Sequence, residues 1–536
     1  MQTGAIQQLE IVFLLLLLFV AVFGYLADKF RQPYPIVLVI AGLLLSFVPG
    51  IPKITLNPDL VFFAILPPLL YAAAWLTSWR EFSFNMVSIL FLAFGLVGFT
   101  VFGVAMCAAW LFPGFDWRLG FVLGAVIATT DTLAATTIAK RVGLPKAIVD
   151  ILEGESLVND ASGLVALEFA IALIVSNQVP SFSSALTRLV YLVVVGLLVG
   201  LLAGWIVYRI EKLIDNAPIE ITISIFVPYA TYLLAENLHA SGVLAVVACG
   251  LYLSRRSSEF FSPVARLQIV AVWSSLTFIL NGFVFVIIGL QLPYVIAGIR
   301  EFSTRQLLLY GATFSALVIL LRMIWIFPGT YLARFIRRHL LHQKLANPRP
   351  AAILIVGWTG MRGVIALAAA IALPTVLEDG QPFAQRNLII FLSFSVIFVT
   401  LVLQGLTLPP LIRWLGLANV PVSNEEEDAA RREMATAALA HLKHSREKCE
   451  PELADAIEDL ASHYQHRLDA LAAHKEMEQD GALAHYLVHQ RLLGDVLRVE
   501  RQTAVRLRDQ DRINDETLRQ LEYELDLREA GTAAPL

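Results

Sequence analysis

A short polar segment, GESLVNDASG at residues 154–163, interrupts a long apolar stretch. In a helix, Glu155 and Asn159 lie four residues apart on one stripe, and Ser156 and Asp160 lie four apart on the neighbouring stripe. Carboxylate, amide and hydroxyl oxygens on one face suit a monovalent cation such as Na⁺. A buried carboxylate holds a proton or a cation, but not both, so Asp160 could couple the two ions. A purely structural Asp–Asn hydrogen bond is the alternative.

A second polar segment, IATTDTLAATT at residues 127–137, lies in another apolar run. Thr129 and Thr130 are further candidate ligands, which gives a Na⁺ site at Asp160, Asn159, Ser156 and Thr130. We expect the helix to be unwound here, with Asp131 compensating the positive ends of the half-helices. Direct coordination of the ion by Asp131 is the less favoured role.

Away from the span ends, only two basic residues, Arg322 and Arg362, fall inside the apolar runs. Charged groups within lipid are costly, so each needs a partner or a function. Arg362, in the glycine-flanked segment TGMRG, is expected to satisfy carbonyl ends or to form a structural ion pair with Glu155. For Arg322, snorkelling, pairing with a carboxylate and binding a lipid headgroup stay open. Glu168 is expected to line a vestibule or to pack rather than to coordinate the ion.

The two parts of the chain differ in charge. Residues 1–420 carry 44 charged side chains among apolar runs of about 20 residues, the length that crosses a bilayer. Residues 421–536 carry 40 charged side chains, with a net charge of −10. This pattern excludes a soluble globular enzyme, gives no strongly basic surface for nucleic acid, and predicts a membrane part followed by a soluble helical tail.

Thirteen candidate spans are delimited by proline, glycine and charged residues. They are residues 9–27, 35–52, 59–77, 84–112, 120–139, 145–176, 184–208, 219–237, 241–254, 270–299, 304–333, 351–375 and 388–413. With the N-terminus outside, the inner loops hold 17 Lys and Arg residues and the outer loops hold six. The positive-inside rule therefore predicts an outer N-terminus and a cytoplasmic tail.

The spans show a weak internal repeat, in which the first six correspond to the last six. The fifth span is interrupted at 127–137 and its counterpart, the twelfth, at 357–370. An offset of seven helices inverts the second copy in the membrane, and paired interrupted helices indicate a midplane ion site in a secondary transporter. The sequence thus predicts an all-α polytopic membrane protein with two inverted six-helix repeats and crossed discontinuous helices.

Two further patterns concern packing and the tail. Gly196, Gly200 and Gly204 form a small-residue stripe in the seventh span, and packing within the chain is favoured over dimerisation there. In the tail, breaks at Pro451, at 480–481 and at 514–516 predict three or four helices.

Several motifs give the membrane part a specific resemblance. They are LPPLLY (66–71), ATTDTLA (128–134), GESLVNDASG (154–163), SGVLAV (241–246), NGFVFVIIGLQL (281–292) and GMRG (360–363). With them, residues 1 to about 415 resemble the monovalent cation:proton antiporter-1 family, which includes bacterial NhaP-type antiporters and the sodium/proton exchangers. The tail has no such resemblance.

The resemblance implies a homodimer of thirteen-helix subunits that works as an elevator. Spans 1–3 and 7–10 would form the dimerisation part, and spans 4–6 and 11–13 the mobile core. It also implies that Asp160 carries both ions, that Ser156, Asn159 and Thr130 assist, and that an Asn at position 159 goes with electroneutral 1:1 exchange. One departure is Thr132, where the family commonly has proline, so the break must depend on other residues.

The leading hypothesis is an antiporter that expels Na⁺ against H⁺ across the plasma membrane, the inner membrane of a bacterium. Li⁺ or K⁺ could replace Na⁺, and the expected partners are these ions, membrane lipid and a second subunit, with no cofactor and no nucleic acid. Binding and release make no covalent bond, so the protein is not expected to be an enzyme. A K⁺/H⁺ antiporter and a pH or cation sensor with output through a regulatory tail are the alternatives, and no filter signal supports a channel.

Overall fold

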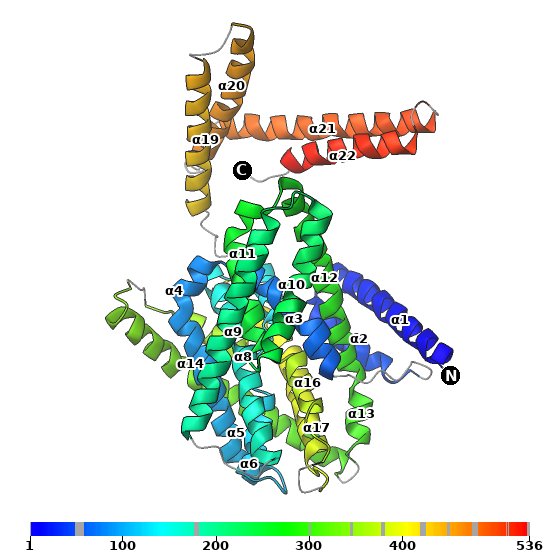
Figure 1. The fold of residues 1–536 in the computed structure, drawn as a ribbon, viewed down its shortest axis with the longest axis vertical. Coiled ribbons are helices and arrows are strands. Elements are labelled where there is room, and N and C mark those ends of the chain that lie inside the picture. Colours follow the sequence, from blue (N-terminus) through cyan, green and yellow to red (C-terminus); the bar gives the residue numbers. More distant parts are fainter. Residues whose placement is uncertain are drawn as a thin grey trace. The chain divides into compact units, whose positions relative to one another are not determined.

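The computed structural model describes residues 2–48, 58–175, 182–299, 302–343, 347–376, 381–418, 425–446, 451–473, 481–510, 512 and 514–532. The chain divides into two compact units, Met1–Pro421 and Val422–Leu536, within one residue of the boundary expected from the change in charge. Helices and the turns between them make up the described residues (Figure 1).

The first unit consists of eighteen α-helices with three π-helical segments in its described residues. In chain order these elements are α1 (Gln2–Lys29), α2 (Tyr34–Leu45), η1 (Leu60–Ile65), α3 (Leu66–Leu76), α4 (Trp79–Leu90), η2 (Phe91–Leu96), α5 (Val97–Leu111), α6 (Trp117–Val126), α7 (Leu133–Val142), α8 (Lys146–Val175), α9 (Phe182–Glu211), α10 (Ala217–Asn237), α11 (Gly242–Phe260), α12 (Pro263–Leu290), α13 (Leu292–Ala297), α14 (Thr304–His339), α15 (Pro350–Trp358), α16 (Val364–Ile371), α17 (Arg386–Val399), η3 (Thr400–Gln404) and α18 (Gly405–Trp414).

Eight helices within the described residues are long and apolar enough to cross a membrane. Three shorter apolar helices, Tyr34–Leu45, Leu60–Leu76 and Trp117–Val126, accompany them. A criterion of continuous length does not count a span that is interrupted, so the expected number of thirteen stays a prediction. The all-helical membrane architecture itself agrees with the sequence.

Both expected helix interruptions are present. α6 ends at Val126 and α7 begins at Leu133, while α15 ends at Trp358 and α16 begins at Val364. Both breaks fall in the polar segments identified from the sequence. Each break leaves backbone groups without intrahelical partners, and these must be satisfied from inside the protein.

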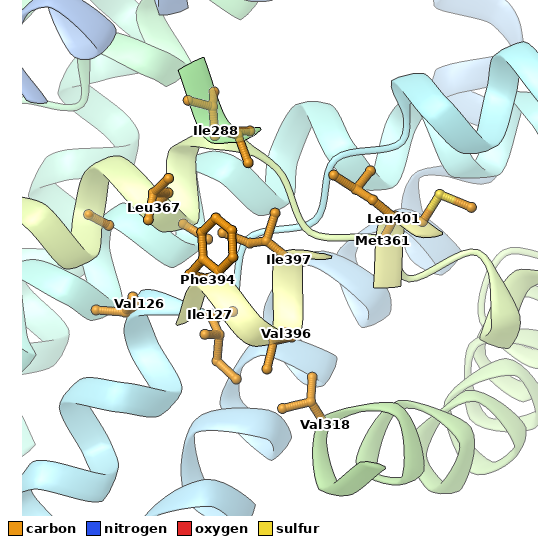
Figure 2. Close-up of a cluster of buried hydrophobic side chains, with 14 of the residues drawn as sticks. Val126, Ile127, Ile288, Val318, Met361, Leu367, Phe394, Val396, Ile397 and Leu401 are labelled. Atoms are coloured by element: carbon orange, nitrogen blue, oxygen red, sulfur yellow. The ribbon is translucent and has the colours of Figure 1, made fainter. Parts of the chain in front are cut away.

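Apolar side chains enclose the two breaks (Figure 2). Ile127 in the first break and Met361 in the second are fully buried. Phe394 and Ile397 of α17 and Leu401 of η3 belong to the same buried cluster. This packing keeps lipid away from the non-helical backbone.

The glycine stripe of α9 packs within the chain, as expected, because it lies against α11. An added Cβ at Gly200 would collide with the carbonyl oxygen of Ala245, and one at Gly196 would lie 2.8 Å from the carbonyl oxygen of Ser241. Only a residue without a side chain permits this approach of the two backbones.

Replacing Gly200 by alanine is therefore expected to destabilise the membrane unit by about 1–3 kcal/mol, because one backbone must move away from the other. Gly98→Ala is the matched control, since a Cβ at Gly98 in α5 meets nothing within 4 Å. Thermal unfolding in detergent should show a lower midpoint for Gly200→Ala only. Equal midpoints for the two variants would contradict the packing argument.

The second unit contains four helices, in agreement with the three or four predicted. They are α19 (Glu425–Arg446), α20 (Pro451–Ala473), α21 (Gly481–Asp509) and α22 (Asp515–Thr532). Arg446 of α19 forms an ion pair with Glu458 of α20 at 3.0 Å, and Arg501 of α21 forms one with Glu529 of α22 at 2.8 Å. The unit is thus built from two helical pairs.

Candidate cation-binding site

The two helix breaks meet each other inside the membrane unit. The amide of Asp131 in the first break donates a hydrogen bond to the carbonyl oxygen of Met361 in the second, at 2.9 Å. Gly363 permits this contact, because a Cβ at that position would collide with the side chain of Asp131. The breaks therefore bring the segments TTDT and GMRG together.

Charged side chains complement the helix ends at this junction. Arg362 Nη1 donates to the carbonyl oxygens of Ala128 at 2.7 Å and Thr129 at 2.9 Å, just beyond the C-terminal end of α6. Asp131 Oδ1 accepts a hydrogen bond at 2.9 Å from the amide of Leu133, the first residue of α7. A cation near a helix C-terminus and an anion near an N-terminus are both stabilised by the helix dipole. Asp131 thus lies where a compensating carboxylate is expected.

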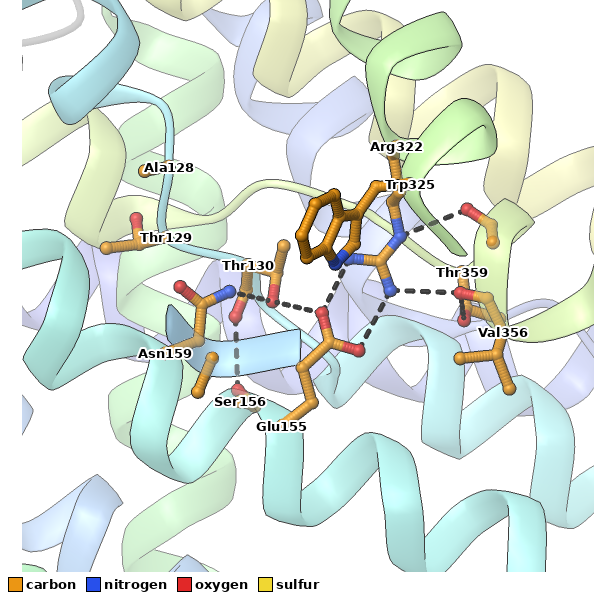
Figure 3. A network of polar contacts seen from close by, with 12 residues as sticks. Ala128, Thr129, Thr130, Glu155, Ser156, Asn159, Arg322, Trp325, Val356 and Thr359 are labelled. Carbon is orange, nitrogen blue, oxygen red and sulfur yellow. Dashed lines mark hydrogen bonds and ion pairs between the residues drawn. The ribbon is translucent and has the colours of Figure 1, made fainter. Parts of the chain in front are cut away.

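The ion pair expected between Glu155 and Arg362 is wrong, because Arg322 of α14 occupies both oxygens of Glu155. The Nη1–Oε1 distance is 2.5 Å and the Nη2–Oε2 distance is 2.9 Å, with both side chains almost fully buried. Arg322 also donates to the carbonyl oxygens of Val356 at 2.9 Å and Gly357 at 3.0 Å, at the end of α15 (Figure 3). Arg322 therefore both neutralises the carboxylate and satisfies a broken helix, which settles the role that the sequence left open.

The candidate ligands of α8 lie against the first break (Figure 3). Asn159 Nδ2 donates to Thr130 Oγ1 at 2.8 Å, and Ser156 Oγ donates to the carbonyl oxygen of Thr130 at 3.1 Å. Thr130 Oγ1 in turn donates to Glu155 Oε1 at 3.4 Å. The structure thus brings the polar face of α8 and the TTDT segment together, as their sequences suggested.

Three buried oxygens at this place have no hydrogen-bond donor among the residues that the structure describes. They are Thr129 Oγ1, Asn159 Oδ1 and Asp160 Oδ1, on side chains that are 3%, 0% and 6% exposed. Leaving a buried acceptor unsatisfied costs about 1–3 kcal/mol. A bound cation would satisfy such oxygens, and their hard character suits Na⁺ or another monovalent cation.

A cavity of about 450 Å³ reaches Asp160. Thr129, Thr130, Asp131 and Ser156 also line it. The lining extends to Lys140 and Glu153, which form an ion pair at 2.7 Å with the Lys140 side chain 64% exposed. One cavity thus connects Asp160 with the exposed Lys140, near the C-terminal end of α7, and with its partner Glu153 in the N-terminal part of α8.

Glu168 of α8 lies outside the cavity that reaches Asp160. It forms an ion pair with Arg188 of α9 at 2.7 Å, and it is not among the residues that line the cavity. Of its two expected roles, this contact fits packing between helices rather than lining a vestibule.

Comparisons with known proteins agree with this geometry. Residues 14–414 match the family model described as sodium/hydrogen exchanger, transmembrane. The chain belongs to the sodium/hydrogen exchanger family. It is therefore a multi-pass membrane transporter rather than an enzyme.

Several members of the family are similar over most of the chain. A protein of Mycobacterium tuberculosis named as an uncharacterized Na⁺/H⁺ exchanger is 32% identical over 523 residues, which cover 95% of this chain and 94% of that protein. The sodium, potassium, lithium and rubidium/H⁺ antiporter of Bacillus pumilus is 35% identical over 390 residues, or 70% of this chain and 57% of the relative. The sodium proton antiporter MjNhaP1 of Methanocaldococcus jannaschii has a similar fold, with a TM-score of 0.56 at 20% identity over 76% of this chain and all of that one.

Proposed function

We propose that this member of the sodium/hydrogen exchanger family exchanges Na⁺ for H⁺ across the plasma membrane, with Asp160 binding either ion in turn. The observation that carries the proposal is the group of buried oxygens without donors at Thr129, Asn159 and Asp160, beside a cavity that reaches Asp160. Ser156 and Thr130 hold the TTDT backbone against α8, and Ser156 also lines the cavity. A proton on Asp160 releases the cation, and loss of the proton restores the site.

Electroneutral 1:1 exchange follows if Asp160 is the one carboxylate that binds a proton in one step of the cycle and a cation in the other. Glu155 is bound by Arg322 through both oxygens, and Asp131 caps α7. The residue before Asp160 is an amide, so it adds no second titrating charge. One carboxylate exchanging one proton for one monovalent cation moves no net charge.

An elevator motion is supported by the chemistry of the cavity wall. The ligands lie on α8 and on the break between α6 and α7. The residues that α3 contributes to the lining are leucines and alanines, among them Leu66, Leu69 and Ala73. The α3 part of the wall therefore holds no fixed polar partner, so the ion-binding helices can slide along that part. We assign α4–α8 and α14–α18, the helices of spans 4–6 and 11–13, to the moving part, within thirteen spans arranged as two inverted repeats.

The remaining features of the proposal concern assembly and orientation. A homodimer in lipid would use the exposed apolar faces of α1 and α9, where Leu14 is 64% and Leu198 60% exposed. The charge bias of the loops supports an outer N-terminus and a cytoplasmic tail unit, to which we assign a regulatory role.

Proteoliposomes containing the full chain and an internal pH dye test the proposal. Adding Na⁺, Li⁺ and K⁺ in turn should change the internal pH with Na⁺, and a valinomycin clamp of the membrane potential should leave the Na⁺ response unchanged. A response that the clamp alters would contradict 1:1 exchange. A response to K⁺ alone would favour K⁺/H⁺ exchange, an activity suggested by the name of the Bacillus pumilus relative. No response to any cation would favour the sensor.

A further inference from the structure

The cavity that reaches Asp160 has a wall of unequal polarity. The part contributed by α3 is apolar, whereas α12 contributes Ser274, Thr277 and Asn281. These three residues follow a spacing of three and then four, so they share one face of α12. Apart from Arg266, Gln268 and Ser275, the other residues of this 28-residue helix are apolar, and polar residues on a helix long enough to cross a membrane call for a function.

The polar groups of this face are not equivalent. Thr277 Oγ1 donates to the carbonyl oxygen of Trp273 at 2.7 Å, one turn earlier in the same helix. Its hydroxyl is therefore engaged by the backbone, as is common for threonine in apolar helices. Asn281 is different, because an amide at a half-buried position on the cavity wall has both a carbonyl oxygen and an N–H₂ group to offer. It begins the segment NGFVFVIIGLQL, to which the exchange chemistry above assigns no role.

The candidate ligands around Asp160 all come from one wall of the cavity, formed by α8 and the break before α7. Thr129 Oγ1, Asn159 Oδ1 and Asp160 Oδ1 all belong to α8 or to the break before α7. A cation at these oxygens still faces the cavity, where water or a group on the opposite helices must complete its shell. Of the oxygens in the wall of α12, that of Asn281 is a carboxamide carbonyl, the stronger ligand for a hard cation.

We propose that Asn281 is a further specificity-determining residue, whose amide oxygen binds the cation on its way between Asp160 and the end of the cavity marked by Lys140 and Glu153. This inference rests on the proposed function and adds a ligand from the wall that faces the ion-binding helices. α12 does not belong to the moving part, so the contact exists only while Asp160 faces this cavity. Asn281 thus acts on cation affinity from one side of the membrane.

The test compares cation affinity from the two sides in membrane vesicles of opposite orientation that contain the full chain. Asn281→Leu keeps the size of the side chain and removes its oxygen. When Na⁺ is added from the side of the Lys140–Glu153 pair, the KM of this variant for Na⁺ should rise about tenfold, because one ion–dipole contact is lost. From the other side, KM should stay within about twofold of the native value, which also shows that the variant is folded. The ratio of the KM values for Na⁺ and Li⁺ should change on the affected side alone.

Two further variants separate a ligand from a packing residue. Asn281→Asp keeps an oxygen and should have a native or lower KM on that side. Thr277→Val, the control on the same face, should leave both KM values unchanged because its hydroxyl is bound within the helix. An unchanged KM in Asn281→Leu, or an equal rise on both sides, would overturn the inference while exchange by the native chain still stands. A native chain without exchange would instead refute the proposed function.

Discussion

Asp160→Asn should abolish cation-driven proton movement in proteoliposomes, with a loss of at least about 100-fold in initial rate. The amide keeps the shape of the side chain and one oxygen, but it has no negative charge to attract the cation and cannot carry a proton at neutral pH. The oxygens of Thr129 and Asn159 remain in place. Residual weak cation binding without proton coupling is therefore expected. The measurement is the internal pH change upon addition of Na⁺, at equal amounts of reconstituted protein.

Asp131→Asn is the matched control, because both carboxylates line the same cavity. Asp131 Oδ1 accepts a hydrogen bond from the amide of Leu133, and an asparagine oxygen makes the same cap about as well. We expect exchange within about fivefold of the native rate, since only the favourable charge at the helix end is lost. If Asp131→Asn is as inactive as Asp160→Asn, the charge of Asp131 is itself required for exchange, and Asp160 is not the only carboxylate on which exchange depends. Activity in Asp160→Asn would contradict the proposed carrier itself.

The sequence was sufficient to locate the broken helices, and the reason is local. Hydroxyls and glycines in TTDT and GMRG disfavour continuous helix, and an apolar stretch makes any polar insertion conspicuous. The positions of Glu155 with Asn159 and of Ser156 with Asp160 on one face of α8 also follow from helical spacing alone. Both inferences depend on residues that are close together in the chain.

Which side chain meets which across helices could not be predicted in the same way. Glu155 and Arg322 are 167 residues apart, and no local pattern specifies the rotation of α14 that brings them into contact. The sequence favours Arg362 as the partner of Glu155 because Arg362 lies in the second break. Its guanidinium group instead donates hydrogen bonds to the carbonyl oxygens of Ala128 and Thr129. The same limit applies to Asn281, whose position on the cavity wall depends on how α12 packs. The signal that could have found Arg322 was its rarity, because it is one of only two basic residues that lie inside the spans away from their ends.

Breaking the buried pair of Glu155 and Arg322 should have the largest effect on stability. Arg322→Met leaves a buried carboxylate without its cation and removes the donors to Val356 and Gly357, so a loss of about 3–5 kcal/mol is expected. Glu155→Gln should cost less, because Arg322 keeps both carbonyl partners and one amide oxygen. Thermal unfolding of the purified variants in detergent measures both effects. Glu168→Gln is the control, since the Glu168–Arg188 pair is about half exposed and is worth about 0–1 kcal/mol.

The double variant decides whether charge or packing dominates at this site. If the uncompensated carboxylate causes most of the loss, Glu155→Gln combined with Arg322→Met should be more stable than Arg322→Met alone, because no buried charge remains. The carbonyl oxygens at the end of α15 would still lack donors, so native stability should not return. A double variant as unstable as the sum of the single variants would mean that the two residues act independently. In that case Arg322 would serve chiefly to cap the broken helix, and Glu155 would contribute through its contact with Thr130.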